Sequence, residues 1–281
     1  MDYHSDRFDD FSLMIFKKNK LCALLPANVD EDIIFSHQGL TFGGLLLPLK
    51  ISFIVVSEIY EAIKKYYEKY SIHQINIKLI PSFYFRYPAN ELACLLQQDN
   101  ASVYRRDKLY AIDYSKELQI HKTKIKYFNR GMRLGLEVRK EDDLSGFWNK
   151  ILIPVLERKH QSKPVHTLFE IQKLKNNFKF NIQQFNVYYE EEILAGITIF
   201  ENEVVVNSQY AASTQDGEKY RALDFLFVYL INHFKKEGKQ FFSMGTVSDE
   251  SKLGFKLGLL KQKEELGCSL YLQDFYTKKL K

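Results

Sequence analysis

The first eighty residues alternate between apolar and polar stretches in a way that predicts a hairpin, a helix and a strand. Apolar stretches at 11–16 and 21–25 flank a polar tip, which is typical of a β-hairpin. Residues 55–70 carry apolar side chains at helical spacing, and Ser57 is a possible N-cap. Residues 75–79 alternate again, so we expect a strand to follow the helix.

The second half of the chain repeats this pattern and extends it. It predicts strands at 185–189, 193–200 and 204–211, a polar turn at 213–219, a helix from 222, a strand at 241–244, a helix at 252–266 and a strand at 269–276. Between the halves we expect a basic helix at 116–133 and a second helix at 142–160, which Pro154 must start or kink. Because helices separate the later strands, we expect a mixed α/β (α+β) sheet, of which the first half is an incomplete copy.

Composition is that of a folded protein. The 281 residues are 46% apolar and 15% aromatic, enough for one large domain or two modest ones. The first ten residues are acidic and polar, unlike a secretory signal, and glycines and polar residues interrupt the most apolar region, 33–49. We therefore expect no transmembrane segment. Cys22, Cys94 and Cys268 are too widely separated for a disulfide framework or a zinc site, which fits a reducing cytoplasm.

The positive charge is concentrated in one region. The net charge is +5, yet residues 101–140 contain eleven Lys and Arg against four Asp and Glu, which gives +7 there and −2 elsewhere. Such a region could bind a phosphorylated ligand, a nucleic acid or an anionic membrane surface. A solvated helix with ordinary surface lysines explains the same count equally well.

The common catalytic signatures are absent from the sequence. It contains no GxSxG, no Walker loop, no GxGxxG after a strand and no HExxH, which disfavours hydrolases, NTPases and dehydrogenases. No two of the seven histidines are three or four residues apart, so we expect no built-in metal site.

Several polar residues nevertheless interrupt apolar surroundings. The glycines near His37 would let backbone N–H groups approach a ligand, although a tight turn would use them as well. Lys78 lies in an apolar strand, where a lysine must extend to solvent, pair or meet a ligand. His166 and Glu170 are four residues apart at a helix start and could share one face, although most such glutamates are simply exposed. The polar turn and helix start at Ala222 could form an anion site or a plain connection.

Six segments spread over nearly the whole chain carry a family resemblance: SHQGLTFGG (36–44), KLIPSFYFRYPANE (78–91), PVHTLFEIQKL (164–174), NSQYAAST (207–214), ALDFLF (222–227) and GLLKQKEELG (258–267). They resemble the acyltransferases of the GNAT superfamily, specifically the FemAB-like branch from bacterial surface-polysaccharide loci. Two sites depart from the family pattern. In the pyrophosphate loop Gln/Arg-x-x-Gly-x-Gly/Ala only the last position, Ala222, matches, and residues 243–245 read Ser-Met-Gly where relatives read Asp-Phe-Gly.

The resemblance implies tandem GNAT-like halves, each a mixed, mostly antiparallel sheet flanked by helices, with the N-terminal half degenerate. The implied division is an N-terminal half at 1–114, a basic connecting helix at 115–145 and an acyltransferase half at 146–281. Strands 204–210 and 241–245 would part to admit an acyl-CoA, and ligands would lie between and along the halves. An amine would attack the thioester directly, without a covalent enzyme intermediate.

On this resemblance we expect a cytoplasmic acyltransferase that moves an acyl group from acyl-CoA to an amino group of a sugar nucleotide or a lipid-linked glycan precursor. Acetyl is the acyl group expected first. The expected residues are Glu170, His166, Gln209 and Tyr210 for catalysis; His37, Lys78, Tyr84, Arg105 and Arg106 for the substrate; and Thr214, Gly217, Ala222, Gly245 and Lys263 for the acyl-CoA cofactor.

Two alternatives stay open, and neither involves DNA. Relatives that build peptidoglycan cross-bridges use aminoacyl-tRNA, and the basic region could bind the tRNA backbone. A non-catalytic binding or scaffold protein would also fit the poorly matched pyrophosphate loop.

Overall fold

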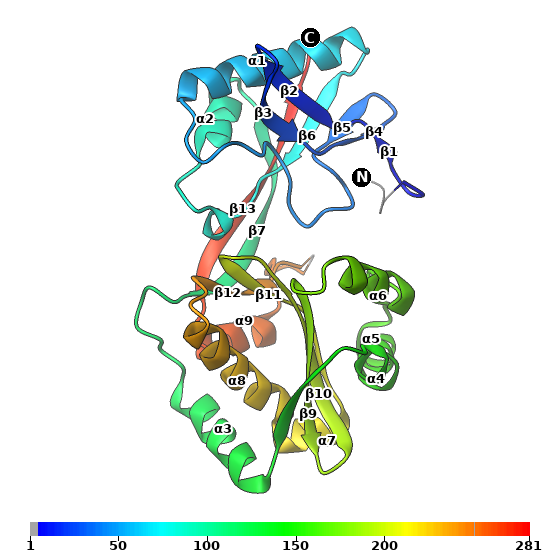
Figure 1. The fold of residues 1–281 in the computed structure, drawn as a ribbon, viewed down its shortest axis with the longest axis vertical. Coiled ribbons are helices and arrows are strands. Elements are labelled where there is room, and N and C mark those ends of the chain that lie inside the picture. The colour runs from blue at the N-terminus through cyan, green and yellow to red at the C-terminus, as the bar shows by residue number, and fades with distance from the viewer. Residues whose placement is uncertain (1–4, 250) are drawn as a thin grey trace. The chain divides into compact units, whose positions relative to one another are not determined.

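A computed structural model describes residues 5–249 and 251–281 (Figure 1). By their contacts the residues group into two compact units, Met1–Lys108 with Tyr271–Lys281 (unit 1) and Leu109–Leu270 (unit 2). Each unit has its own hydrophobic core. The limits expected from the sequence, at residues 114 and 145, remain a prediction, because contact-based units need not coincide with folding units.

Unit 1 is built on a mixed, mostly antiparallel sheet. Its strands lie in the order β1-β4-β5-β6-β13, and of the adjacent pairs only β5 and β6 run parallel. These strands are β1 (Asp9–Asp10), β4 (Asn28–Asp30), β5 (Ile33–Phe35), β6 (Gln74–Lys78) and β13 (Ser269–Lys279). The other elements are the hairpin of β2 (Leu13–Lys17) and β3 (Lys20–Leu25), and the helices α1 (Phe53–Lys69), η2 (Ser82–Tyr84) and α2 (Glu91–Gln98).

Helix α1 forms because its sequence supplies one continuous buried face. Val56, Ile63 and Tyr67 are at most 4% exposed, and their spacing puts them on the same side of the helix. The expected N-cap, Ser57, is wrong. The helix begins a turn earlier, after Ser52, whose hydroxyl accepts a hydrogen bond from the backbone three residues on, because Val56 already belongs to the buried face.

Unit 2 has the same kind of sheet. Its strands lie in the order β7-β12-β11-β10-β9-β8, and only β11 and β12 run parallel. They are β7 (Ser102–Asp113), β8 (Glu137–Glu141), β9 (Ile182–Tyr189), β10 (Glu192–Glu201), β11 (Val205–Ser213) and β12 (Phe241–Thr246). The helices are α3 (Lys122–Leu134), α4 (Ser145–Phe147), the π-helix η3 (Trp148–Leu152), α5 (Ile153–His160), α6 (Leu168–Asn177), α7 (Gln215–Tyr220), α8 (Ala222–Lys236) and α9 (Leu257–Glu265).

The two units share one connection. A helix joins a parallel pair of strands in each of them, as β5-α1-β6 and as β11-α8-β12 (Figure 1). The last strand of each half then pairs in the sheet of the other unit: β7 pairs with β12, and β13 pairs with β6. This confirms the expected fold class of tandem mixed α/β halves, with the first half the incomplete copy.

Several local expectations need correction. The helix expected at 116–133 begins only at Lys122, because the ring of His121 caps it. The helix expected at 252–266 begins at Leu257, because the chain first turns at Gly254, where φ is 69°. The polar turn expected at 213–219 contains the short helix α7. Strands β7 and β8 and helix α2 were not expected at all.

The most apolar region of the sequence, 33–49, does not form a helix. It forms β5 and a loop in which Ser36 and His37 are buried. Within the described residues, no helix combines the length and the apolar character that crossing a bilayer requires.

Candidate active site

The two parallel strands of unit 2 separate part-way along their length. Strands β11 and β12 pair only from Val205 to Asn207 and from Phe241 to Ser243. Strand β11 then continues to Ser213 without a partner on that side among the described residues. This matches the parting of strands that the resemblance implies. Backbone groups on this edge of β11 therefore have no strand partner and can meet a ligand.

A β-bulge lies where the strands begin to part. On the other side of β11, Tyr210 pairs with Thr198 and Ser208 pairs with Ile199, so Gln209 is the extra residue. The Gln209 side chain is half-buried, and its Oε1 accepts a hydrogen bond of 3.0 Å from Asn207 Nδ2. Bulges of this kind redirect the side chains around them and are frequent beside active sites.

Two of the expected catalytic residues are in contact beside this bulge. His166 Nδ1 lies 2.6 Å from Tyr210 Oη, and His166 N donates to the same oxygen over 3.3 Å. Both side chains are half-buried, and the fully buried ring of Trp148 packs edge-on against Tyr210, with 5.1 Å between centroids. A phenol in contact with an imidazole can move a proton between the ring and a reacting group.

Glu170, the other expected catalytic residue, takes part in capping α6. Its Oε2 accepts from Thr167 N at 2.7 Å and from Thr167 Oγ1 at 3.0 Å, while Glu170 N donates to Thr167 Oγ1 at 3.2 Å. This is a capping box, in which two backbone donors of the first turn are satisfied reciprocally. A base role for Glu170 stays a prediction that has to be separated from this structural one.

The capping box can be tested by its effect on stability. Replacing Thr167 with alanine should lower the free energy of unfolding by about 1 kcal/mol, because the first turn of α6 loses an acceptor. Urea unfolding followed by circular dichroism measures this. Glu170→Gln keeps an acceptor at the same position but cannot act as a base. If Glu170→Gln turns over more slowly than wild type but is equally stable, Glu170 acts as the base. If its turnover equals that of wild type, Glu170 has no base role.

Helix α7 occupies the segment expected to form the pyrophosphate loop. Thr214 caps this helix, and its Oγ1 accepts a hydrogen bond of 2.9 Å from Gly217 N. A Cβ atom on Gly217 would lie 2.2 Å from Leu194 O, so glycine is required here for close packing against β10. Ala222 is buried at the start of α8, whose first turn has no side-chain cap.

Gly245 and Lys263 meet at the end of β12. Lys263 Nζ donates to Gly245 O at 3.0 Å and to Thr246 O at 2.8 Å. The Lys263 side chain is only 2% exposed, and this burial lowers its pKa to about 8. Burial also raises the pKa of neighbouring Cys268 to about 12. The two expected cofactor residues thus form one contact between α9 and β12.

In unit 1, the glycine-containing loop 36–44 closes around Lys78. Lys78 N donates to Ser36 Oγ at 2.8 Å, and Lys78 Nζ donates to Leu40 O. His37 is 1% exposed with φ of 48°, and its Nδ1 accepts a hydrogen bond from Gly39 N. These contacts give Lys78 and His37 structural partners in the loop where the sequence suggested a ligand.

The expected substrate residues divide between two faces of the sheet. Arg105 and Arg106 are adjacent on β7 and therefore point to opposite sides. Arg105 makes two bonds to Asp107, of 2.9 and 2.6 Å, and Arg106 binds Asp274 at 2.8 Å. Burial and then the Arg105 charge lower the pKa of Lys78, so Arg105 shares an environment with Lys78.

Tyr84 lies beside the loop that surrounds Lys78. Its ring centroid is 4.4 Å from that of Phe42 in this loop. The structure therefore gathers His37, Lys78 and Tyr84 around one loop and leaves Arg106 on another face.

Sequence reasoning did not identify Trp148 as a site residue, although it is the single tryptophan of the chain. Its Nε1–H is buried beside Tyr210 and has no hydrogen-bond partner in the part of the chain that the structure describes. Over the same residues, no group of three or more His, Cys, Asp and Glu side chains is placed to hold a metal ion.

Comparisons with known proteins bear on the fold. No protein-family model matches the chain, and no curated protein matches it. The structure of FemX is similar to this one: the match covers 95% of this chain and 88% of the FemX chain, with a TM-score of 0.70 and 8% sequence identity. A tandem GNAT protein from the clavulanic acid biosynthesis pathway matches over 96% and 82%, with a TM-score of 0.52 and 10% identity. The chain has a FemAB-like, tandem GNAT fold.

A third solved structure is similar to this chain over most of its length. It is the C-terminal domain of a putative lysylphosphatidylglycerol synthetase from Agrobacterium fabrum, which matches over 96% of this chain and 84% of its own. Its TM-score is 0.63 and its identity 14%. Likeness at identities this low concerns the fold alone, so the chemistry of this chain has to be argued from its own residues.

Proposed function

We propose that unit 2 transfers an acyl group directly from an ester or thioester donor to an amine. The observation that carries this proposal is the end of β11–β12 pairing at Asn207 and Ser243, next to the bulge at Gln209. Unpaired backbone N–H groups on this edge can donate to the donor carbonyl oxygen as it becomes negative. The amine nitrogen bonds to the carbonyl carbon, the bond to the leaving oxygen or sulfur breaks, and the leaving group takes up a proton.

Tyr210 and His166 supply the proton path in this proposal. With the proton on His166 Nδ1 facing Tyr210 Oη, the other ring nitrogen accepts the proton that the amine loses. The Tyr210 hydroxyl protonates the leaving group, and His166 restores the Tyr210 proton through their 2.6 Å contact. Protons and bonds then balance without a covalent intermediate.

We propose aminoacyl-tRNA as the donor. In place of an open pyrophosphate loop, α7 uses Gly217 N to bind Thr214, which leaves that donor unavailable to a phosphate. Helix α3 of the same unit exposes Lys122, Lys126 and Arg130, which suit a nucleic acid backbone. The FemAB-like relatives that build peptidoglycan cross-bridges use this donor.

The tRNA proposal predicts salt-sensitive binding. The apparent affinity for total tRNA should fall steeply with salt, and Lys126→Glu/Arg130→Glu should reduce the slope of log K against log salt by about 1 for each phosphate that no longer meets a cation. Filter binding over a salt series measures the slope. Lys69→Glu/Lys279→Glu, which changes two exposed lysines of unit 1, is the matched charge control. Weak binding of tRNA would remove tRNA as the donor. So would an equal change in the slope of log K against log salt by the two double variants.

A second candidate donor is acyl-CoA, which one observation favours. Helix α8 starts at Ala222 without a side-chain hydrogen bond to its first turn, and the N–H groups at a helix start favour an anion such as a pyrophosphate. A CoA ester bound there would raise the thermal midpoint, because it binds the folded state selectively. Thermal melting with acetyl-CoA and with tRNA therefore separates the two donors, and no shift with either would favour a non-catalytic binding protein.

For the acceptor we retain an amino group on a sugar nucleotide or lipid-linked glycan precursor, in polysaccharide biosynthesis. Arg105, whose side chain is 57% exposed beside its ion pair with Asp107, provides the cation that a phosphate oxygen would meet. Transfer of label from the donor to an amino-sugar nucleotide tests the acceptor directly.

A further inference from the structure

One end of unit 1 exposes apolar side chains that its core does not use. Phe16 is 55% exposed, Leu49 59% and Ile54 71%. They come from the tip of the β2–β3 hairpin, the segment before α1 and the first turn of α1. Soluble proteins rarely expose large apolar side chains in a cluster unless the cluster binds something.

An ion pair and backbone hydrogen bonds join these three segments. Lys17, at the end of β2, forms an ion pair of 2.5 Å with Glu58 in α1. Leu24 of β3 exchanges backbone hydrogen bonds of 2.8 and 3.0 Å with Leu46, three residues before Leu49. The inner face of the hairpin, including Ala23, packs in the core of unit 1. The ion pair therefore places the hairpin tip beside α1, and the Leu46–Lys50 segment, held at the end of β3 away from the tip, continues directly into α1.

Lysines surround these apolar side chains. Lys18 and Lys20 lie at the hairpin tip, where Lys18 and Asn19 have the positive φ angles of a tight two-residue turn, and Lys50 follows Leu49. The two carboxylates of α1 on this side, Glu58 and Glu61, are paired with Lys17 and Lys64. We define the hairpin–helix surface as Phe16, Lys18, Lys20, Leu49, Lys50 and Ile54.

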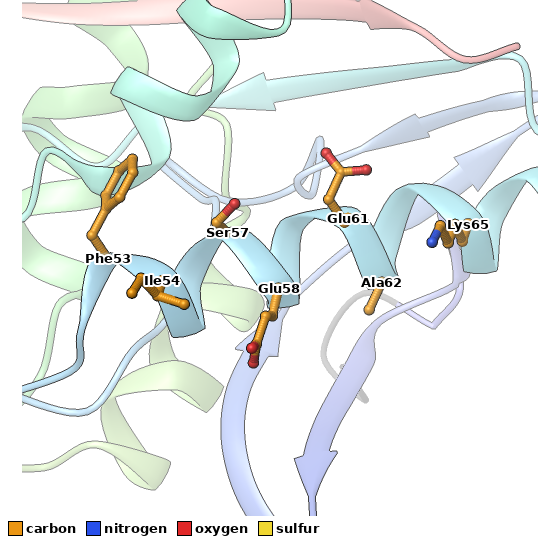
Figure 2. Close-up of a pocket in the computed structure, with 7 residues that line it drawn as sticks. All are labelled: Phe53, Ile54, Ser57, Glu58, Glu61, Ala62 and Lys65. Atoms are coloured by element: carbon orange, nitrogen blue, oxygen red, sulfur yellow. The ribbon is translucent and has the colours of Figure 1, made fainter.

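A groove continues this surface along α1. Its volume is about 540 Å³, and all its lining side chains come from α1, as Figure 2 shows. The apolar Phe53 and Ile54 lie at the start of the groove, and Lys65 lies at its other end. Between them lie Ser57, Glu58, Glu61 and Ala62, so the groove adds apolar area next to Ile54 but no net positive charge, and the basic groups of the surface are those of the hairpin tip and Lys50.

We propose that the hairpin–helix surface binds the headgroup region of an anionic membrane. Apolar side chains flanked by lysines match such a surface, where the apolar groups enter the acyl boundary and the lysines meet lipid phosphates. A protein partner fits less well, because lysine is depleted from the centre of protein interfaces. A second copy of the chain in a two-fold dimer would bring the lysines of both copies together. The proposal does not depend on the acyl-transfer function.

Vesicle binding tests this proposal. The full chain should sediment with vesicles of phosphatidylcholine containing about one third phosphatidylglycerol and much less with phosphatidylcholine alone. Lys18→Glu/Lys20→Glu should weaken binding about 30-fold, and Leu49→Ser/Ile54→Ser about 10-fold or more. Lys235→Glu/Lys236→Glu, at the exposed end of α8 in unit 2, is the matched charge control and should bind like wild type.

Three outcomes of the vesicle experiment would overturn the proposal. They are no binding to the anionic vesicles, equal binding to both vesicle types, or equal weakening by the surface and control variants. A concentration-dependent dimer that the surface variants dissociate would assign the surface to a second copy instead. Thermal midpoints close to wild type for each variant establish that the changes act on binding and not on folding, because the substituted side chains are exposed.

Discussion

Replacing Tyr210 with phenylalanine is expected to lower kcat/KM for acyl transfer by about 10²- to 10³-fold, the range for loss of a positioned proton-transfer group. The substitution keeps the ring and its packing on Trp148, and removes only Oη, which contacts His166 Nδ1. The leaving group then has no acid, and the amine proton has no path through His166. The measurement is kcat/KM with whichever donor supports turnover, aminoacyl-tRNA or acetyl-CoA.

Tyr188→Phe is the matched control for this prediction. Tyr188 is half-buried in β9 of the same sheet, and its hydroxyl donates a 2.6 Å hydrogen bond to Glu141. Its loss should leave kcat/KM near the wild-type value. Combining Tyr210→Phe with His166→Ala should cost little more than either change alone, because groups that act as one unit are not additive. Equal losses for Tyr210→Phe and Tyr188→Phe, or full additivity with His166→Ala, would contradict the proposed proton path.

The amphipathic elements could be predicted because their periodicity reports burial directly. The apolar spacing of α1 identified it, although its cap at Ser52 was misplaced. Strand β7 was missed because charged residues interrupt its apolar pattern. The structure shows why they are tolerated there: Arg105 binds Asp107, two residues on and on the same face, and Arg106 binds Asp274 of the neighbouring strand β13.

The exchange of last strands could not be predicted from local pattern. Phe275 of β13 pairs with Lys78 of β6, at the other end of the chain, and nothing in either segment specifies this partner. Pairing between distant strands depends on which sheet edge the fold leaves open. A reading of the sequence in order therefore assigns β13 to the second half.

The candidate site was predictable in its members but not in its contacts. His166 and Tyr210 came from separate motifs, and only the folded chain brings their side chains within 2.6 Å. Gly217 illustrates the converse. A glycine before a helix suggested a phosphate loop, whereas the requirement for glycine comes from Leu194 O on a neighbouring strand, which the local sequence does not contain.

Lys263 should make the folded chain more stable as pH rises. A lysine in an ordinary ion pair has the opposite effect, because its pKa is raised in the folded state. Burial lowers its pKa to about 8 in the folded chain, against 10.5 as the ordinary value. Between these pH values the unfolded chain binds more protons than the folded chain, so the free energy of unfolding rises with pH. The rise from this group is about 1 kcal/mol between pH 7 and 9 and about 3 kcal/mol once Lys263 is neutral in both states.

The comparison of wild type with Lys263→Met isolates this contribution. The variant leaves Gly245 O and Thr246 O without the Nζ donor, a cost that does not change with pH, whereas the slope belongs to the lysine alone. Cys268 acts with the opposite sign above pH 9, because burial raises its folded pKa to about 12, but it is present in both proteins. Urea unfolding at several pH values gives the difference curve. We expect the free energy of unfolding of wild type to rise with pH relative to that of Lys263→Met. Relative to Lys261→Met, which changes an exposed lysine as the control, it should not rise. Parallel curves for wild type and Lys263→Met would mean that water reaches Nζ, and that the end of β12 is more open than its burial indicates.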